Sequence, residues 1–385
     1  MTQPPERRIR ETPHIEHPEL WQSTDEARSN EQTSKKGSHS LTGPQNPGCP
    51  EIPSSITSAS PMTLGGLTIV PLRIKPLIKK KHSVKMGVRQ LDKSGVEVRE
   101  VSNHGSVPSL HAENNTKHYI LFIEGDQLIG AKQDRVCNST VLLSPKSAAR
   151  IPVSCIEEGR WRHKSRTFGS SKYNATPSLR RKISKTKEAS RRESGGRQQH
   201  SASQLSVWDH VSCFSQHAGV HSETKAMQDI YEAREVELEN QLKRNSENSK
   251  DMPSSDALLA DCPKAVHGWI LQTPDHGISI DIFGSPKLCR QAWRRMMASA
   301  AMEAMIYQQR ASRTRAGKNT PPPRRPNFNL NKPKAVKKLL KAVQSVPLEQ
   351  VTPVAAGLEQ RIVSPELSGS YLTLENRLVH LGLTI

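Results

Sequence analysis

Short apolar runs separated by turn-forming residues constrain the fold of the first half of this chain. Between residues 64 and 156 the apolar residues occur in stretches of strand length, with Gly, Pro and Ser in the gaps. The runs are LTIVPLRI, GVEVREVS, HYILFIEG, RVCNSTVLLS and ARIPVSCI. In GVEVREVS the Val residues alternate with polar residues, which is the period of a strand with one buried face. This pattern predicts a sheet of short, mainly antiparallel strands.

Helical spacing replaces this pattern in the second half of the chain. LSVWDHVSCF has apolar residues near helical spacing, and SETKAMQDIYEAREVELENQLKRN predicts a helix of roughly twenty residues with Ser222 as its N-cap. Ser285 and Pro286 predict the start of another helix, and AVKKLLKAVQ follows as a further one. GWILQTPDHGISIDIF and SYLTLENRLVHLGLTI are typical of two hairpins that share one sheet system. The expected fold class is α+β, with helices packed on short antiparallel strands.

Much of the chain is expected to lie outside any core, because only 34% of its residues are hydrophobic and 4% are aromatic. Residues 1–60 are rich in Pro, Ser, Thr, Gln, Glu and Asn, and we predict that they form a disordered tail. Two basic segments, about 162–204 and 310–333, are predicted to be flexible insertions. Residues 61–385 are expected to form a single domain, because the last hairpin has too little apolar surface to fold alone.

The net charge of +19 is concentrated in two places. Residues 158–199 contain thirteen Lys and Arg against three Glu, and residues 310–341 contain eleven basic residues and no acid, which leaves −2 for the rest of the chain. Clustered basic residues favour nonspecific contact with a polyanion, because binding releases its counterions. Aromatic residues are few in these segments, among them Tyr173 and Phe328, which argues against sequence-specific reading of nucleic acid bases. The alternative is a pair of solvated basic insertions.

Several classes of protein are excluded by the motifs that the sequence lacks. The six cysteines include no CxxC pair and have no His partners at zinc-finger spacing, so we interpret them as free thiols. There is no P-loop, no G-x-S-x-G, no H-E-x-x-H and no dinucleotide G-x-G-x-x-G after a strand. No apolar run has the 18 residues of a membrane span, and a secretory signal is lacking, so the expected location is the cytoplasm without a membrane partner.

Polar side chains are unusually dense where two of the predicted strands end, in EGDQLIGAKQDRVCN and in SCIEEGRW. Carboxylates, amides and cations beside Gly125 and Gly130 predict a polar cleft that binds a phosphate, ribose or amide group. The candidate ligand-binding residues are Lys132, Gln133, Arg135, Asn138, Ser154, Arg160 and Trp161. The alternative is a structural network in which Glu124 or Glu157 pairs with Arg135 or Arg160 and holds two strands together.

Three residues are candidates for catalysis. Glu124 and Glu157 are candidates for a general acid or base, and Cys155 for a nucleophile. Cys155 lies in the apolar run PVSCI, so buried packing is the competing interpretation. A hydrated divalent metal held by Asp and Glu oxygens is an open alternative, but no carboxylate spacing specifies one, so we assign no metal site, and the cofactor is unknown. His380, on the last predicted strand, fits a hydrogen-bonded core residue better than a ligand.

Five strings of the chain together resemble one known family. They are VEVREVSNHGSVPSL, IEGDQLIGAKQDRVCNSTVLL, IPVSCIEEGRW, IYEAREVELE and RLVHLGL. The family is the ARG and rhodanese-phosphatase-superfamily-associated domain, where ARG stands for ADP-ribosylglycohydrolase, and the similarity extends from about residue 65 to the end. The matching positions are Glu124, Gly130, Ala131, Lys132, Gln133, Arg135, Asn138, Ser154, Cys155, Glu157, Gly159, Arg160 and Trp161.

This resemblance implies a place in NAD or ADP-ribose metabolism without assigning a reaction, because members are known mainly through the domains that accompany them. The chain departs from the family pattern at Gln127, where a Glu is usual, and at Asp134, where an Asn is usual, and also by its two basic insertions. A carboxylate role at Gln127 is therefore lost.

Two hypotheses remain open on the sequence, and they differ on whether the protein is an enzyme. In the first, the protein binds or processes a nucleotide-like metabolite, with cations holding phosphate and Glu124 or Glu157 acting on ribose or water. In the second, it is a noncatalytic protein whose basic segments bind a polyanion or a protein partner that the sequence does not specify.

Overall fold

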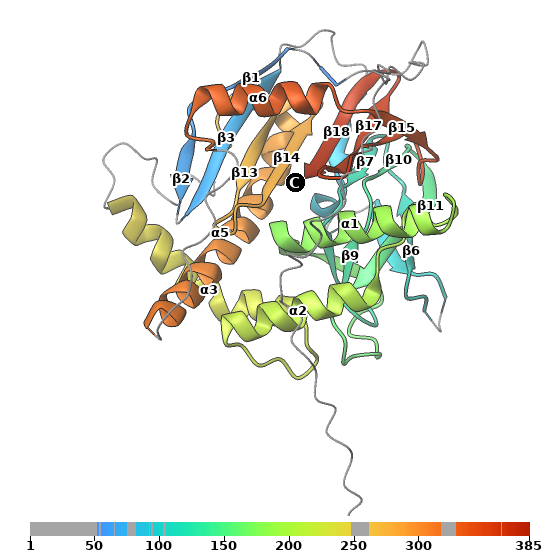
Figure 1. The fold of residues 1–385 in the computed structure, drawn as a ribbon. Helices are drawn as coiled ribbons and strands as arrows, with labels where there is room; N and C mark the ends of the chain where they lie inside the picture. The colour runs from blue at the N-terminus through green and yellow to red at the C-terminus, as the bar shows by residue number, and fades with distance from the viewer. Residues whose placement is uncertain are drawn as a thin grey trace, which may run out of the picture. The chain divides into compact units, whose positions relative to one another are not determined.

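A nine-stranded antiparallel sheet joins the two ends of the described chain (Figure 1). Its strands are β1 (Ile56–Ser58), β2 (Met62–Leu64), β3 (Leu67–Ile74), β13 (Gly268–Gln272), β14 (Ile278–Phe283), β15 (Leu348–Val351), β16 (Leu358–Ile362), β17 (Ser368–Leu374) and β18 (Arg377–Thr384). Their order is β1-β3-β13-β14-β18-β17-β16-β15, with β2 paired to β3. The pairing of β14 with β18 makes the two predicted hairpins neighbours, which confirms that they share one sheet.

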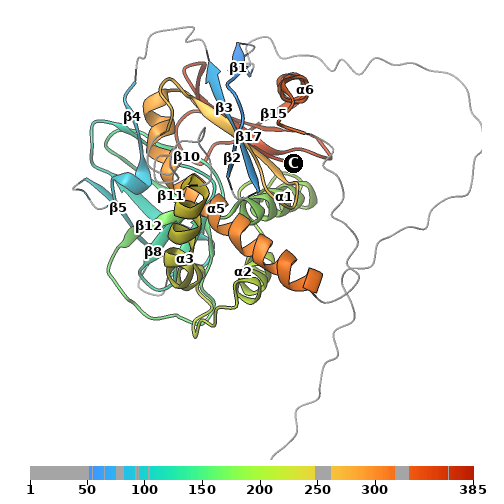
Figure 2. The same cartoon turned by 90° about the vertical axis from the view of Figure 1, so that its left-hand side faces the viewer.

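Strand β3 is apolar on both of its faces, and a helix covers each face. On β3, Val70 and Leu72 belong to a cluster that includes Leu339 of α6 (Pro333–Gln344). Leu67 and Ile69 belong to the cluster on the opposite face, to which α5 (Pro286–Ala316) contributes. Figure 2 shows α6 on one side of the sheet and α5 on the other. Strands β3, β13 and β14 are therefore buried on both sides, which explains their apolar runs.

Two smaller sheets carry the polar motifs. The first, in the order β12-β8-β9-β11-β6-β5, is six-stranded, and the second, β10-β7-β4, has three strands. Their strands are β4 (Val84–Met86), β5 (Val96–Glu100), β6 (Ser109–Asn114), β7 (Tyr119–Phe122), β8 (Asp126–Gly130), β9 (Arg135–Cys137), β10 (Val141–Leu143), β11 (Ser147–Cys155) and β12 (Phe168–Asn174). A 3-10 turn, η1 (Gly87–Arg89), follows β4. Val96 and Val98 of β5 are buried while the residues between them are exposed, as the alternation predicts.

Three more helices lie in the middle of the chain: α1 (Pro177–Glu193), α2 (Gln204–Ala218) and α3 (Met227–Glu247). The predicted helices correspond to α2, α3, α5 and α6, and with the sheets they confirm the α+β class. The Ser285 hydroxyl accepts a hydrogen bond from the Leu288 amide at 3.2 Å, as expected of the cap of α5. None of the described helices has an apolar stretch long enough to cross a membrane.

The prediction of a flexible insertion at 162–204 is wrong. This segment contains β12, α1 and the start of α2, and Thr176 caps α1 by accepting a hydrogen bond from the Leu179 amide. Apart from Leu179 and Ile183, most of the side chains that α1 buries are polar or charged, among them Arg180 and Lys187. Their partners are acids far away in the sequence, so the composition of the segment alone suggests disorder.

The two other predicted disordered regions lie largely outside the described residues. The computed structural model describes residues 52–53, 55–64, 66–74, 82–91, 93, 95–102, 105–247, 262–316, 329–362 and 364–385, which belong to one unit, Gly48–Ile385. Within the predicted tail, Ile56–Ser58 pairs with β3, so ordered structure begins before residue 61. Of the segment 310–333, residues 310–316 continue α5 and residues 329–333 lead into α6.

We predict that Leu339→Ala destabilises the fold by about 2–4 kcal/mol, because it leaves a cavity where α6 packs on the sheet. Urea unfolding measures this loss. Lys338→Ala, which changes an exposed neighbour on the same helix, is the control and should shift stability by less than about 0.5 kcal/mol. Equal effects of the two substitutions would contradict the packing of α6 on this face.

Candidate functional site

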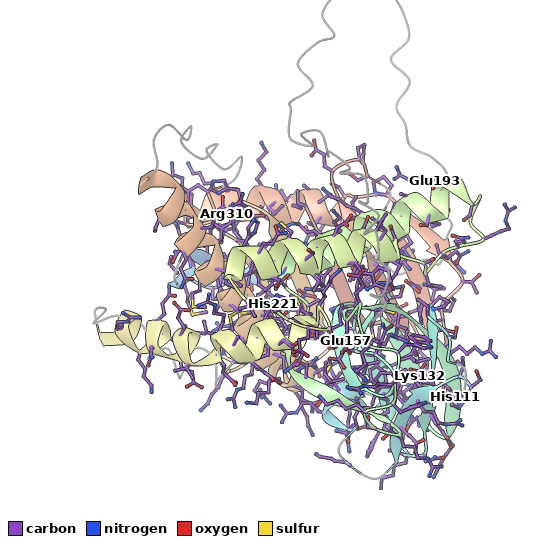
Figure 3. The ribbon with its side chains drawn as sticks, turned by 90° about the horizontal axis from the view of Figure 1, so that it is seen from below. His111, Lys132, Glu157, Glu193, His221 and Arg310 are labelled. Atoms are coloured by element: carbon purple, nitrogen blue, oxygen red, sulfur yellow. The ribbon has the colours of Figure 1, made fainter. Side chains whose placement is uncertain are left out.

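Strands β9 and β11 bring the two polar motifs side by side, as the sequence predicts. Cys155 of β11 pairs with Arg135 of β9, and Ser154 with Val136. Gly130 ends β8 with φ of +116°, a conformation that L side chains rarely adopt, and a Cβ there would lie 2.4 Å from the Ser165 hydroxyl oxygen. Figure 3 shows Lys132 and Glu157, one from each motif, in the same region of the molecule.

An arginine clamp, formed by Arg160, Glu157 and Asp134, joins the ends of the two motifs. The Arg160 guanidinium donates two hydrogen bonds to Glu157, at 2.8 and 2.6 Å, and one to Asp134 Oδ1 at 3.2 Å. It also donates to the carbonyl oxygen of Ala131 at 2.6 Å. Burial raises the pKa of Glu157, but hydrogen bonds from Arg160 and from the Asp134 amide outweigh burial and lower it. Glu157 and Arg160 thus hold the loop after β8 against the turn after β11.

Cys155 lies beneath this region and is fully buried. Its sulfur accepts a hydrogen bond from Arg135 Nη1 at 2.8 Å, and the Gln204 side chain bonds both its backbone N–H and its carbonyl. Burial raises the pKa of the thiol to about 11, although Arg135 opposes the shift. The thiol is therefore protonated at neutral pH, which favours the packing interpretation over that of an activated nucleophile.

A tryptophan platform is formed by the exposed ring of Trp161 and the buried side chains of Lys132, Arg135 and Glu100. The Trp161 side chain is 47% exposed, and Lys132 Nζ and Arg135 Cζ lie 5.4 and 5.5 Å from the centre of its ring. Arg135 is fully buried, and its Nε and Nη2 atoms make no hydrogen bond. Glu100 Oε1 lies 3.7 Å from Nη2, and Glu100 Oε2 also accepts no hydrogen bond. A buried guanidinium with two unused donors is suited to an anionic ligand.

Gln133, Ser154 and Gln127 support this region from within. Gln133 accepts from Arg135 Nη1 at 3.0 Å and donates to the Glu158 carbonyl at 3.1 Å, and Ser154 is buried in β11. The Gln127 amide nitrogen donates to the Asn174 carbonyl at 2.8 Å. A Glu at position 127 has no proton to donate when ionised, so the amide found here serves a structural contact.

Glu124 and Asn138 belong to a different group of residues, at the other end of β9. Lys187 of α1 donates to Glu124 Oε2 and, at 2.7 Å, to the Asn138 carbonyl. Glu359 and Arg361 of β16 also interact with the Lys187 ammonium. Burial and, next in size, the charge of Arg361 lower the pKa of Lys187 to about 8, although the carboxylates of Glu124 and Glu359 oppose this shift. The predicted site residues are thus divided between this group, which contains Glu124 and Asn138, and the region around Arg135 and Trp161.

The group continues into a buried ion network that the sequence analysis missed. Arg180 binds Asp281 of β14 through two hydrogen bonds of 2.8 and 2.7 Å, and His380 Nε2 lies 3.2 Å from Asp281 Oδ1. Burial raises the pKa of Asp281, but Arg180 and His380 lower it well below its usual range. Arg295 of α5 pairs with Asp126 at 3.0 Å. The available signal was a lone acid within an apolar run, as in SIDIF, since a buried charge requires a partner. His380 is a hydrogen-bonded core residue, the interpretation that the sequence favoured.

The described residues contain no group of three or more His, Cys, Asp and Glu side chains placed to hold a metal ion. The groups that the structure brings together are instead mixed pairs of cations and carboxylates, with an aromatic ring at the surface.

We predict that Asp134→Asn becomes more stable relative to the wild type as pH rises. Burial raises the pKa of Asp134 to about 6, from 3.8, despite the Gly130 amide and Arg160. In the wild type, protonated Asp134 contributes its full stability below the pKa that this carboxyl has in the unfolded chain. This contribution is lost as pH rises through the pKa in the folded chain. Because Asn does not ionise, its advantage should grow between pH 4 and pH 7.5 by up to about 3 kcal/mol.

Urea unfolding at several pH values measures this difference, and Asp209→Asn, at an exposed position on α2, controls for the loss of one negative charge. A difference between Asp134→Asn and wild type that stays constant from pH 4 to pH 7.5 would show that Asp134 ionises like a solvated acid.

The comparisons with known proteins give one family. The model of the ARG and Rhodanese-Phosphatase-superfamily-associated Protein domain, ARPP-1, matches residues 55–384. No curated protein and no solved structure matches the chain. The matched range includes both polar motifs, the arginine clamp and the tryptophan platform, and it extends over most of the chain. The protein therefore belongs to the ARPP-1 family, as the resemblance of its motifs indicates.

Proposed function

We propose that the protein binds a nucleotide-like metabolite that carries a diphosphate, of the ADP-ribose or NAD type, at the tryptophan platform. The observation that carries the proposal is the fully buried Arg135, of which two nitrogen atoms, Nε and Nη2, donate no hydrogen bond, beside the half-exposed ring of Trp161. Native proteins rarely leave such donors unused, and a phosphate oxygen is their strongest common acceptor.

The chemistry of the platform matches the parts of such a ligand. The indole face of Trp161 offers a stacking surface for a base, which contributes about 1–3 kcal/mol in comparable sites. Lys132 and Arg135 carry two positive charges against the one negative charge of Glu100, so the platform attracts anions. Glu100 Oε2 is free to accept a hydrogen bond from a ribose hydroxyl.

The family adds a second line of support. Its name associates its members with ADP-ribosylglycohydrolases and with the rhodanese and phosphatase superfamily. This association concerns accompanying domains, so it supports the class of ligand and not a reaction.

The proposal concerns binding because the three candidate catalytic residues are engaged elsewhere. Glu157 bonds Arg160 with both oxygens, Glu124 pairs with Lys187, and the Cys155 thiol is protonated at neutral pH. Their catalytic roles stay predictions. The hydrogen bonds of Glu157 and Arg160 hold the loops that carry Lys132 and Trp161. Glu157 and Arg160 therefore position the platform.

We predict that ADP-ribose or NAD quenches the fluorescence of Trp161 and raises the melting temperature of the full chain. At about one hundred times the dissociation constant, a ligand stabilises the folded state by roughly 2.7 kcal/mol. Trp161→Ala should weaken binding by about 5- to 100-fold, since stacking is lost. Trp161→Phe should retain the thermal shift and lose the quenching, because Phe still offers a ring face.

The control is Trp208→Phe, which replaces a half-buried tryptophan on α2 and should leave both the thermal shift and the quenching unchanged. Absence of a thermal shift with ADP-ribose, NAD or ADP at millimolar concentration would overturn the proposal. A shift that Trp161→Ala leaves intact would place the ligand elsewhere.

The outer face of α6 supports the second candidate function, noncatalytic binding of a polyanion. The lysines of this face are all exposed, and none forms an ion pair with an acid among the residues that the structure describes: Lys332, Lys334, Lys337, Lys338 and Lys341. The helix contains no acidic residue, and its apolar side is fixed on the sheet. It therefore presents a fixed row of positive charges, and the basic segment 310–333 precedes most of it in the sequence.

We predict that replacing Lys334, Lys337, Lys338 and Lys341 by Gln weakens binding to a short nucleic acid duplex and lowers its salt dependence, because fewer counterions are released. Replacement of four exposed lysines outside α6 by Gln is the matched control: Lys93, Lys117, Lys164 and Lys264. Titration at several salt concentrations measures both effects. Binding that is unchanged by the four α6 substitutions would remove this candidate and leave the nucleotide proposal untouched.

A further inference from the structure

Two free cysteines that are distant in the sequence meet at the start of α5. The sulfur of Cys262, just before β13, lies 3.7 Å from the sulfur of Cys289, in the first turns of α5. Cys262 is 7% exposed and Cys289 is fully buried. The other described cysteines have different surroundings: Cys155 contacts Arg135, Cys137 is buried, and Cys213 is exposed beside His217. Among the described cysteines, the only sulfur-to-sulfur hydrogen bond joins Cys262 and Cys289.

The two thiols are not equivalent. A hydrogen bond from Cys289, together with the nearby Arg290, lowers the pKa of Cys262 against the effect of burial. Burial raises the pKa of Cys289, and its role as the hydrogen-bond donor raises it further. Cys262 is therefore the thiol that more readily becomes a thiolate, the form that reacts with oxidants. It is also the more exposed of the two.

We propose that Cys262 and Cys289 form a reversible oxidation site, at which a hydroperoxide reacts with Cys262 and Cys289 then closes a disulfide. This site lies outside the tryptophan platform and does not depend on the proposed ligand.

The reaction needs no other participant. Cys262 loses its proton, and the thiolate attacks one peroxide oxygen as the O–O bond breaks. The leaving alkoxide takes up the released proton, so the products are the Cys262 sulfenic acid and an alcohol, or water when the oxidant is hydrogen peroxide. The Cys289 sulfur then attacks the sulfenic sulfur, and its proton leaves with the hydroxide as water. Two thiols and one hydroperoxide thus give one disulfide, one alcohol and one water. A dithiol reductant reverses the step by exchange.

The geometry requires only a small movement. A disulfide has a sulfur-to-sulfur distance of about 2.04 Å, so the 3.7 Å separation must shrink by less than 2 Å, which rotation of the side chains can contribute. The bond would attach the approach to β13 to α5. Since α5 also carries Arg295 and Ser299, which bind Asp126 and the Asn174 backbone, the disulfide would restrain the helix that supports β8 and β12.

The test is to treat the reduced full chain with hydrogen peroxide, block the remaining thiols with N-ethylmaleimide, and map the peptides by mass spectrometry. We expect two of the six cysteines to escape blocking, a peptide linked through Cys262 and Cys289, and recovery of both thiols with dithiothreitol. The oxidised protein should melt a few degrees higher than the reduced protein. Cys213→Ser should retain the linked peptide, because it removes only an exposed thiol.

Two variants test the order of the steps. In Cys289→Ala the sulfenic acid of Cys262 has no partner, so dimedone should label Cys262, whereas Cys262→Ala should give no label at Cys289. Failure of wild-type protein to form the Cys262 to Cys289 bond, at peroxide concentrations that oxidise Cys213, would overturn the proposal. That observation needs no variant, so it stands even where a substitution impairs folding. Equal labelling of the two alanine variants would overturn the assigned order.

Discussion

The ion pair between Arg180 and Asp281 joins the helical layer to the middle of the nine-stranded sheet. Both side chains are buried, two hydrogen bonds connect them, and Arg180 Nε also donates to the Glu124 carbonyl at 3.2 Å. A buried pair of this kind contributes little compared with apolar side chains of the same volume, but loss of one partner costs about 3–5 kcal/mol. The main effect of the pair is therefore to specify that α1 contacts β14, and its net contribution to stability is small. It gives α1 one position between β14 and the strands that carry the polar motifs.

Other buried ion pairs also fix which elements meet, and strand β9 connects these pairs to the tryptophan platform. Lys187 with Glu124 and Arg295 with Asp126 each join elements that are distant in the sequence, whereas Arg361 pairs with Glu359 within β16. Asn138 follows one end of β9 and Arg135 begins the other, so the network and the platform lie roughly 10 Å apart along the strand. A strand held at one end by buried charges and at the other by the arginine clamp is a rigid base for an exposed ring, and preorganisation of this kind favours ligand binding.

Periodicity predicted most of the elements and the class of fold. The two hairpins, α2, α3, α5 and α6 follow the apolar spacing, and Ser285 caps α5 as predicted. The prediction that Ser222 caps α3 is wrong, because that helix begins at Met227. The failure at α1 has a physical cause: outside Leu179 and Ile183 its buried face is largely polar, and the signal of a helix in sequence is the spacing of apolar residues. The candidate site was predicted only in part, because sequence patterns report on neighbouring residues. The motifs indicated that β9 and β11 would carry the polar residues, but Glu100, Lys187 and Arg361 lie in segments where nothing local marks them as partners.

Local patterns alone therefore specify many of the strands, most of the helices, the pair of polar motifs and the family to which the chain belongs. The partner of each buried charge, the separation of Glu124 from Trp161, and the meeting of Cys262 with Cys289 follow from how the elements pack. The reason is that hydrophobic period and turn chemistry are properties of neighbouring residues. Whether a buried charge is tolerated, and whether a thiol is reactive, depends instead on a group that comes from elsewhere in the chain.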